Sequence, residues 1–132
     1  MREIKFRAWL TQEKKMVDVY RLDFTDKNGK PDLIMWYWVQ KGTQAGLPEG
    51  FELMQFTGLY DAFHKEIYEG DILYDPMYRF AHAVRWNNDI GGFSLDNGFP
   101  LYKKVTDYCK VIGNIYENPE LLEQQKGGGN NE

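Results

Sequence analysis

The stretch Lys65-Glu-Ile-Tyr-Glu-Gly-Asp71 decides the fold class of this chain. Its isoleucine and tyrosine favour an extended strand, and the apolar pattern resumes at Ile72-Leu-Tyr74. Between the two apolar runs, Gly70 can adopt backbone conformations that are closed to other residues, and Asp71 can accept hydrogen bonds from nearby main-chain amides. The pattern therefore predicts a long strand that bends at Gly70-Asp71, as a strand does when it turns the corner of a small barrel.

Alternating apolar and polar residues predict further strands before this stretch. Residues 4–9 alternate, and after the polar run Thr11-Gln-Glu-Lys-Lys15 a second apolar segment covers residues 16–22, which is typical of an opening hairpin. Phe51-Glu-Leu-Met-Gln-Phe56 alternates again, and Thr57-Gly58 is expected to end that strand.

The second half of the chain continues the β pattern. Residues 81–87 and 93–95 are predicted to form two strands joined by a glycine-containing loop, and residues 105–112 are predicted to hold the last strands. Asn118-Pro119-Glu120 is a helix start, because an N-cap residue is followed by proline at the first helical position and then by an acid.

These elements predict a mainly β protein. The expected core is a small, strongly bent, SH3-like β-barrel formed largely by residues 51–117, with an N-terminal β-hairpin packed against it and a short C-terminal helix. A chain of 132 residues with 16% aromatic residues suits a single domain, predicted over residues 1–126. The glycine-rich residues 127–132 are predicted to form a disordered tail.

Several classes of protein are disfavoured by composition. No apolar run approaches the roughly 20 residues that span a bilayer, and the N-terminus lacks a signal-peptide core, so we expect a cytoplasmic protein without membrane contact. Cys109 is the only cysteine, which excludes an internal disulfide and a multi-cysteine metal cage. Its neighbours, Tyr108-Cys-Lys-Val-Ile112, predict a buried strand residue in preference to a reactive thiol.

The most conspicuous apolar segment is Leu33-Ile-Met-Trp-Tyr-Trp-Val39, which is apolar on both faces of an extended chain. Such a strand is either covered on both sides, for example by the loop at residues 41–50, or it meets another molecule. We predict Trp36, Tyr37 and Trp38 as the binding residues of the second arrangement, and the buried strand remains the alternative.

Catalytic and metal sites have weaker support. His64 and His82 are the candidate proton carriers, but neither has a nucleophile or acid partner in a recognisable motif. Four acidic residues could together hold a divalent cation, namely Glu66, Glu69, Asp71 and Asp75. A solvated acidic edge is the favoured interpretation of this cluster. No glycine-rich run has the lysine and hydroxyl residue of a phosphate-binding loop. We predict no catalytic residue, metal or cofactor, and no small-molecule substrate is evident.

Nucleic-acid binding is a second possibility. Residues 1–30 carry eight Lys or Arg against five Asp or Glu, whereas the remainder carries eight against fifteen. Bases would stack on exposed aromatic residues beside the basic ones, and the candidate cations are Arg2, Lys5, Arg7, Lys14 and Lys15. A net charge of −4 and the acidic remainder of the chain argue against a long cationic groove.

Four ordered blocks resemble a known family. They are Met1-Arg-Glu-Ile-Lys-Phe-Arg-Ala-Trp9, Leu53-Met-Gln-Phe-Thr-Gly-Leu59, Lys65-Glu-Ile-Tyr-Glu-Gly-Asp-Ile72 and Val111-Ile-Gly-Asn-Ile-Tyr-Glu-Asn-Pro119. Together they are similar to the YopX-like family of phage, prophage and mobile-element proteins. The resemblance implies a small, largely β protein of unknown molecular function and brings no catalytic residues with it. The chain departs from the family pattern at Tyr60-Asp-Ala-Phe-His64, where a polar, glycine-containing turn is usual, so that Phe63 either packs or protrudes.

The function expected from these observations is that of a non-enzymatic phage or prophage accessory protein. It would act through protein–protein contact, either with itself or with a host or phage component. A nucleic-acid-binding small β-barrel is the alternative, and an enzyme with an unrecognised site is a distant third.

Overall fold

The structure is a computed structural model that describes residues 2–23, 32–38, 42–45 and 50–122. Side chains are described in these ranges except at positions 20, 21, 23, 32–38 and 42–45. The described chain is mainly β, as predicted, and it forms two compact units. The N-terminal unit is Ile4–Gln55, and the C-terminal unit combines Phe56–Glu132 with Met1–Glu3. The single domain over residues 1–126 stays a prediction, and the predicted tail at 127–132 lies outside the described residues.

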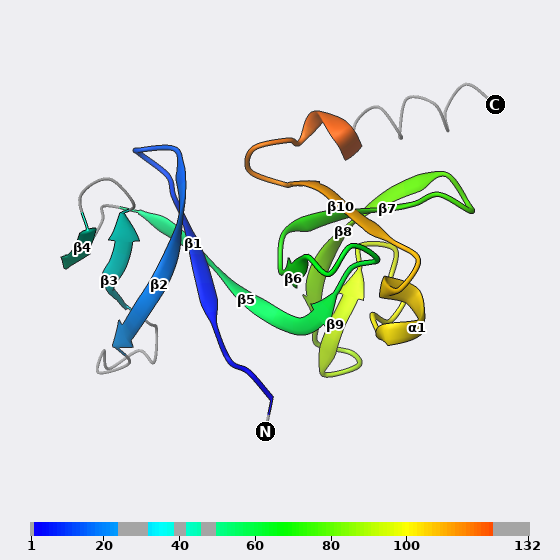
Figure 1. Cartoon of the computed structure of the whole chain (residues 1–132), viewed down its shortest axis with the longest axis horizontal. Coiled ribbons are helices and arrows are strands. Elements are labelled where there is room, and N and C mark those ends of the chain that lie inside the picture. Colours follow the sequence, from blue (N-terminus) through cyan, green and yellow to red (C-terminus); the bar gives the residue numbers. More distant parts are fainter. Residues whose placement is uncertain (1, 24–31, 39–41, 46–49, 123–132) are drawn as a thin grey trace. The chain divides into compact units, whose positions relative to one another are not determined.

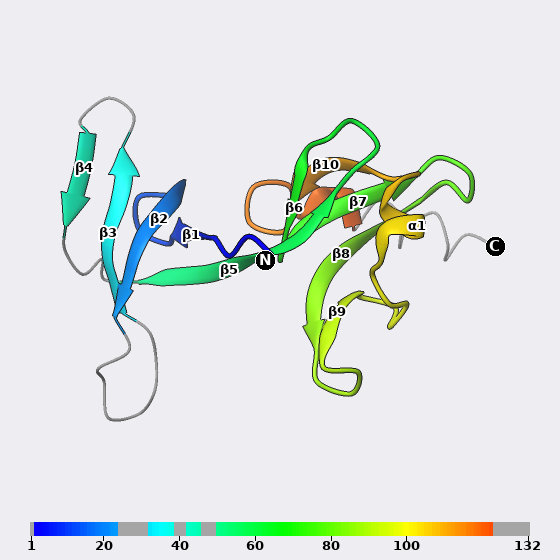
Figure 2. The same ribbon diagram turned by 60° about the horizontal axis from the view of Figure 1, so that its bottom comes forward.

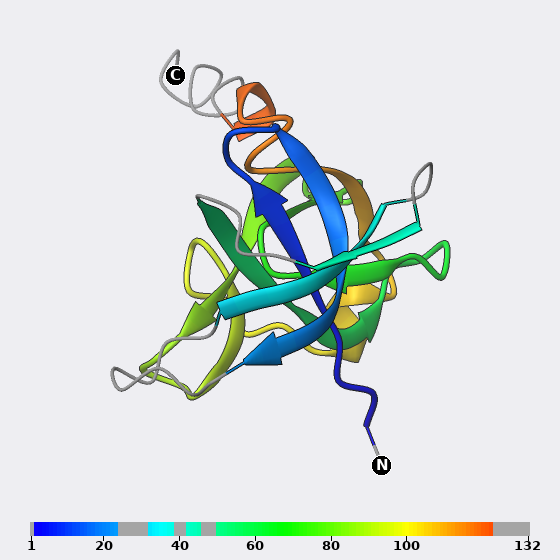
Figure 3. The same ribbon diagram turned by 90° about the vertical axis from the view of Figure 1, so that its left-hand side faces the viewer.

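The N-terminal unit is an antiparallel sheet with the strand order β4-β3-β2-β1-β5. Its strands are β1 (Phe6–Leu10), β2 (Lys15–Asp23), β3 (Asp32–Trp38), β4 (Gly42–Ala45) and the first half of β5 (Phe51–Tyr60). The predicted opening hairpin is confirmed: β1 pairs with β2, and Ala8 lies opposite Val17 (Figure 3, blue). These two residues and Leu10 form the buried core of the unit. The loop predicted at residues 41–50 is wrong in part, since it contains β4, which pairs with β3.

The C-terminal unit is built on a curled sheet. Its elements are the second half of β5, β6 (Glu66–Tyr68), β7 (Asp71–Asp75), β8 (Phe80–Asn87), β9 (Gly92–Leu95), α1 (Lys103–Thr106) and β10 (Lys110–Asn114) (Figure 1). Strands β10-β7-β8-β9 form an antiparallel sheet that bends into a half-barrel, and β6 pairs with β5 (Figure 2). The strongly bent β architecture is therefore confirmed. The core of this unit contains Ile67, Leu73, Val84, Leu95, Cys109 and Val111.

The long strand predicted to bend at Gly70-Asp71 is wrong in part, because the chain forms two strands, β6 and β7, with a turn at Glu69-Gly70 between them. The chemistry of this turn is the predicted one. Gly70 has a φ of 84°, and the carboxylate of Asp71 accepts a hydrogen bond of 2.8 Å from the amide of Tyr68. The amide of Gly70 donates to the carbonyl of Val84, and its own carbonyl accepts from the amide of Ile115. Asp71 is only 2% exposed. The bend thus carries the chain from the β5–β6 pair into the half-barrel, with its polar groups satisfied by the protein.

Strand β5 does not end at Thr57-Gly58 as predicted. Gly58 has a φ of 85°, and the register of β5 against β6 shifts between Phe56 and Tyr60, so these residues form a bulge inside the strand. The hydroxyl of Thr57 donates to the carbonyl of Ile67 at 2.7 Å and ties the bulge to β6.

The last predicted strands are also partly wrong. Val105 and Thr106 belong to helix α1, and β10 begins only at Lys110. Thr106 is fully buried, and its hydroxyl donates to the carbonyl of Lys103, which fixes the single helical turn. A β-branched pair such as Val105-Thr106 favours a strand by propensity, and burial of the turn overrides that preference here. The helix start predicted at Asn118-Pro119-Glu120 is confirmed, since helix begins at Glu120.

Candidate functional site

The C-terminal unit contains a pocket of about 580 Å³. Three separate segments build it, namely β7 through the β7–β8 turn to the start of β8, the end of β9 with its following loop, and α1 with the link to β10. The lining residues are Leu73, Asp75, Met77, Tyr78, Phe80, Leu95, Asn97, Phe99, Lys104, Val105, Tyr108 and Cys109. A volume of this size lies in the range of sites that take a large apolar group.

The pocket has a buried apolar floor and an exposed aromatic rim. Leu73, Leu95 and Cys109 of the floor are each at most 5% exposed. Four large side chains of the rim are between 50% and 71% exposed, and they are Met77, Tyr78, Phe99 and Tyr108. Large apolar residues gathered around one hollow are unusual on a surface in contact with water alone.

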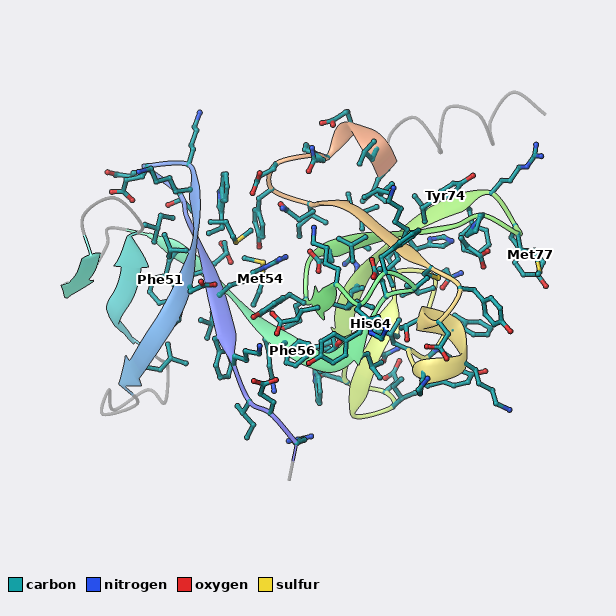
Figure 4. All side chains as sticks on the ribbon, in the orientation of Figure 1. Phe51, Met54, Phe56, His64, Tyr74 and Met77 are labelled. Atoms are coloured by element: carbon teal, nitrogen blue, oxygen red, sulfur yellow. The ribbon has the colours of Figure 1, made fainter. Side chains whose placement is uncertain are left out.

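The β7–β8 turn presents two of these rim residues. The carboxylate of Asp75 accepts hydrogen bonds from the amides of Met77 (2.8 Å) and Tyr78 (3.3 Å). Arg79 closes the turn with a φ of 56°, and its amide donates to the carbonyl of Asp75. Figure 4 shows Met77 at the end of this hairpin. The backbone of the turn is therefore fixed while the side chains of Met77 and Tyr78 stay in solvent.

The loop after β9 is held by an interaction with β8. His82 Nδ1 lies 2.5 Å from a carboxylate oxygen of Asp96, whose other oxygen accepts from the amide of Ala83. The other ring nitrogen of His82 contacts the amide group of Asn97 at 3.4 Å. The Asn97 side-chain oxygen accepts from the amide of Phe99, which orients the loop that carries this rim residue.

His82 consequently has an acid partner that its sequence neighbourhood did not reveal. The spacing of 14 residues between His82 and Asp96 matches no catalytic motif, and register between β8 and β9 alone brings them together. Both ring nitrogens of His82 are engaged within the unit, which suits a structural role.

Cys109 lies on the floor of the pocket as a protonated thiol. Burial, together with the negative charges of Asp75 and Asp61, raises the pKa of Cys109 to about 11. The predicted burial is confirmed at 3% exposure, although Cys109 precedes β10 and does not lie within a strand. At neutral pH this thiol has almost no thiolate form and is a poor nucleophile.

Two neighbouring lysines of helix α1 lie close to the pocket, and they differ in whether they have an acidic partner. The ammonium of Lys103 is 2.9 Å from the carboxylate of Asp107, one helical turn away. Lys104 lines the pocket, is exposed and forms no ion pair within the part of the chain that the structure describes. The pocket therefore has one lysine whose charge is available to an incoming group.

The turn between β5 and β6 resolves the question raised by residues 60–64. Asp61 accepts hydrogen bonds from the amides of Phe63 (2.8 Å), Lys65 (2.9 Å) and Val111 (3.0 Å), so a tight turn is present. Burial alone would raise the pKa of Asp61, but these three donors together lower it below the ordinary value. Phe63 protrudes with 71% of its surface exposed, and the ammonium of Lys110 lies 5.5 Å from the centre of its ring.

The predicted binding residues lie in the other unit. Trp36, Tyr37 and Trp38 belong to β3, whose backbone pairs with β2 and β4, but their side chains lie outside those described. Their role in binding stays a prediction.

The other candidate residues are dispersed. His64 is exposed in the β5–β6 turn with a φ of 63°, and Asp71 and Asp75 each hold a different turn. Within the described ranges, no three His, Cys, Asp or Glu residues are grouped to hold a metal ion. Among the same residues, no helix has the length and apolar character needed to cross a membrane.

The rim residues escaped the sequence prediction, yet a signal was present. Residues 76–80 read Pro-Met-Tyr-Arg-Phe, and two large apolar side chains in a hairpin turn are unexpected where polar residues are the norm. Phe99 follows Asp96-Asn-Gly98, another turn, and the same reasoning applies to it.

Comparisons with known proteins place the chain in a family. The family model described as YopX protein matches residues 5–123. The fold is similar to the crystal structure of protein EF1440 from Enterococcus faecalis, with a TM-score of 0.64 and 29% sequence identity over 92% of this chain and 99% of that one. No curated protein matches the chain. The chain belongs to the YopX protein family.

Proposed function

We propose that this YopX-family chain is a non-enzymatic accessory protein of a phage or prophage, which works in the cytoplasm by binding another protein. The setting rests on the resemblance of its four sequence blocks to phage and prophage proteins. The mode of action rests on one observation in the C-terminal unit, the apolar pocket with its exposed aromatic rim.

The rim has the composition of a protein interface. Tyrosine, phenylalanine and methionine are enriched at the centres of interfaces, where their removal from water provides much of the binding free energy. Met77, Tyr78 and Tyr108 are each at least 65% exposed, so most of their apolar surface is still available for burial by a partner.

The chemistry of the pocket supports binding over catalysis. Cys109 is held as a thiol by its raised pKa, and His82 uses both ring nitrogens for contacts with Asp96 and Asn97. An activated nucleophile needs an adjacent base or a lowered pKa, whereas the pKa of Cys109 is raised and His82 is not among the lining residues.

Self-association through β3 is a second proposed contact. Because β3 pairs with both β2 and β4, its backbone is engaged along both edges at Met35, Trp36 and Tyr37. A second copy would therefore have to meet the face of the strand and not its edge. Charging Trp36 or Trp38 should break such an oligomer and leave a folded monomer, and light scattering that finds the unmutated chain monomeric would remove this contact.

Site-specific photo-crosslinking in host cells tests the binding proposal. A photoreactive phenylalanine analogue at position 78 should yield one defined protein adduct, identified by mass spectrometry. The matched control carries the same analogue at Trp86, which is 49% exposed on β8 outside the pocket lining. Equal adducts from both positions, or none from position 78, would contradict the proposal.

A further inference from the structure

We propose that the pocket binds an acidic peptide segment of the partner, which inserts one large apolar side chain between the rim residues and sets a carboxylate against Lys104. This inference rests on the proposed function and adds the chemistry of the partner to it. Three features of the pocket support the proposal, namely its floor, its rim and its charges.

The floor of the pocket favours an apolar side chain of the peptide, which we call the anchor. Leu73 and Leu95 are already buried, and Cys109 is an uncharged thiol, so a polar group at this depth would lose its hydration without gaining a strong partner. A leucine, phenylalanine or tryptophan side chain fits both the apolar lining and a volume of about 580 Å³.

The exposed rim favours a ligand that extends beyond the pocket. Met77 and Tyr78 stand on the β7–β8 turn, and Tyr108 stands on the opposite segment between α1 and β10. A ligand confined to the hollow would leave these side chains largely in water. A peptide that continues over the rim on both sides of the anchor would cover them.

The charges select an acidic partner. Asp107 is neutralised by Lys103, and the carboxylate of Asp75 already accepts two amides of its own turn. Lys104 and Arg79 are exposed and have no ion pair within the described chain, and together they outweigh the single negative charge that Asp75 keeps, so the net charge around the aromatic rim is positive. A carboxylate close to the anchor would pair with Lys104, whereas a basic segment would be repelled.

Selection from a random 12-residue peptide display library on the full chain tests the inference. The wild-type chain should enrich peptides in which Asp or Glu lies within a few positions of a large apolar residue. Synthetic versions of these peptides should bind the Lys104→Glu variant about 3- to 10-fold more weakly, as expected for reversal of one exposed charge pair. Selection on Lys104→Glu should in turn enrich Lys or Arg.

Two controls separate the possible outcomes. Arg85→Glu makes the same charge change on exposed β8 outside the pocket lining and should leave selection unchanged. Tyr78→Ser alters an exposed rim residue and should abolish binding while circular dichroism shows an intact fold.

Each contrary result has a distinct meaning. Peptides that depend on Tyr78 but carry no excess of acids would overturn this inference and leave the proposed function standing. Failure to enrich any peptide that depends on Tyr78 would overturn both. If single-stranded oligodeoxythymidine displaces the peptides, and added salt weakens this displacement, the occupant of the pocket is nucleic acid and the peptide proposal is wrong.

Discussion

Two turns flank strand β7. Both are held by hydrogen bonds from main-chain amides to a carboxylate, but they have different roles. Before β7, Asp71 accepts the amide of Tyr68 and Gly70 takes a φ of 84°. After β7, Asp75 accepts the amides of Met77 and Tyr78, and Arg79 takes a φ of 56°. In each turn a carboxylate satisfies main-chain donors beside a residue in the left-handed region.

The difference between the turns is burial. Asp71 is 2% exposed, and both backbone groups of Gly70 bond to other parts of the half-barrel. Met77 and Tyr78 are exposed, and only their own amides are bound within the turn. The first turn serves the architecture, whereas the second presents apolar side chains from a fixed backbone, which is the arrangement expected of a recognition loop.

The largest expected effect comes from exchanging the two carboxylates for alanine. Asp71→Ala leaves the amide of Tyr68 buried without its acceptor and should lower the free energy of unfolding by about 3 kcal/mol. Asp75→Ala removes bonds that water replaces and should cost about 0.5–1 kcal/mol. Urea unfolding followed by circular dichroism measures both, and equal losses would break the comparison.

The reactivity of the Cys109 thiol can be compared between the folded chain, where it lies on the floor of the pocket, and the unfolded chain. With a pKa of about 11 against an ordinary value of 9.0, the native thiol should react with iodoacetamide about 100-fold more slowly than in urea-unfolded chain at pH 7.5. Asp75→Asn should lower this pKa, because the charge of Asp75 contributes to raising it. An alkylation profile that does not change in Asp75→Asn would show that the turn has no electrostatic influence on the pocket.

Asp61 is a third turn carboxylate and, like Asp71, is buried, so its protonation can be followed with pH. Because the pKa of Asp61 is lowered in the folded chain, its contribution is present above the unfolded value near 3.8 and is lost as the pH falls through the folded pKa. Asp61→Asn should therefore cost about 1–2 kcal/mol at pH 7, and the gap to the wild type should narrow below pH 4. Urea midpoints measured from pH 7 to pH 2.5 give this gap, and a constant gap would contradict the assignment.

The smallest effect should come from Arg79→Gly. A non-glycine residue in the left-handed region carries about 1–2 kcal/mol of strain, which glycine removes. Glycine in turn loses more backbone entropy on folding, which costs about 0.5–1 kcal/mol. The variant should thus be more stable by about 0.5–1 kcal/mol, whereas Gly70→Ala in the buried turn should be less stable. Thermal unfolding of both variants compares them, and a destabilised Arg79→Gly chain would show that the arginine side chain contributes more than its backbone costs.

Much of the architecture could be predicted because its signals are local. The bend at Gly70-Asp71 and the opening hairpin follow from the residues at those positions, and so does the helix start at Asn118. Strand β5 and helix α1 were misplaced because distant partners decide them: β6 holds the bulge at Gly58, and burial of Thr106 fixes the helical turn.

The pocket was beyond local reasoning. Its lining comes from separate segments, such as those of Leu73, Leu95 and Lys104, which only the strand order β10-β7-β8-β9 and the placement of α1 bring together. The apolar residues of the 76–80 turn and Phe99 after the next turn were the local signs of it. The family blocks gave no help, since none of the four contains a lining residue.

The hydrogen bond between Asp61 and the amide of Val111 spans 50 residues and has a consequence for synthesis. A ribosome makes the β5–β6 turn well before the strand that supplies this donor, so this bond of the Asp61 carboxylate must be made by water until β10 emerges. Contacts of such long sequence separation slow folding. We therefore expect the C-terminal unit to assemble late and in one step, and a chain that stops before Val111 should remain a target for proteases.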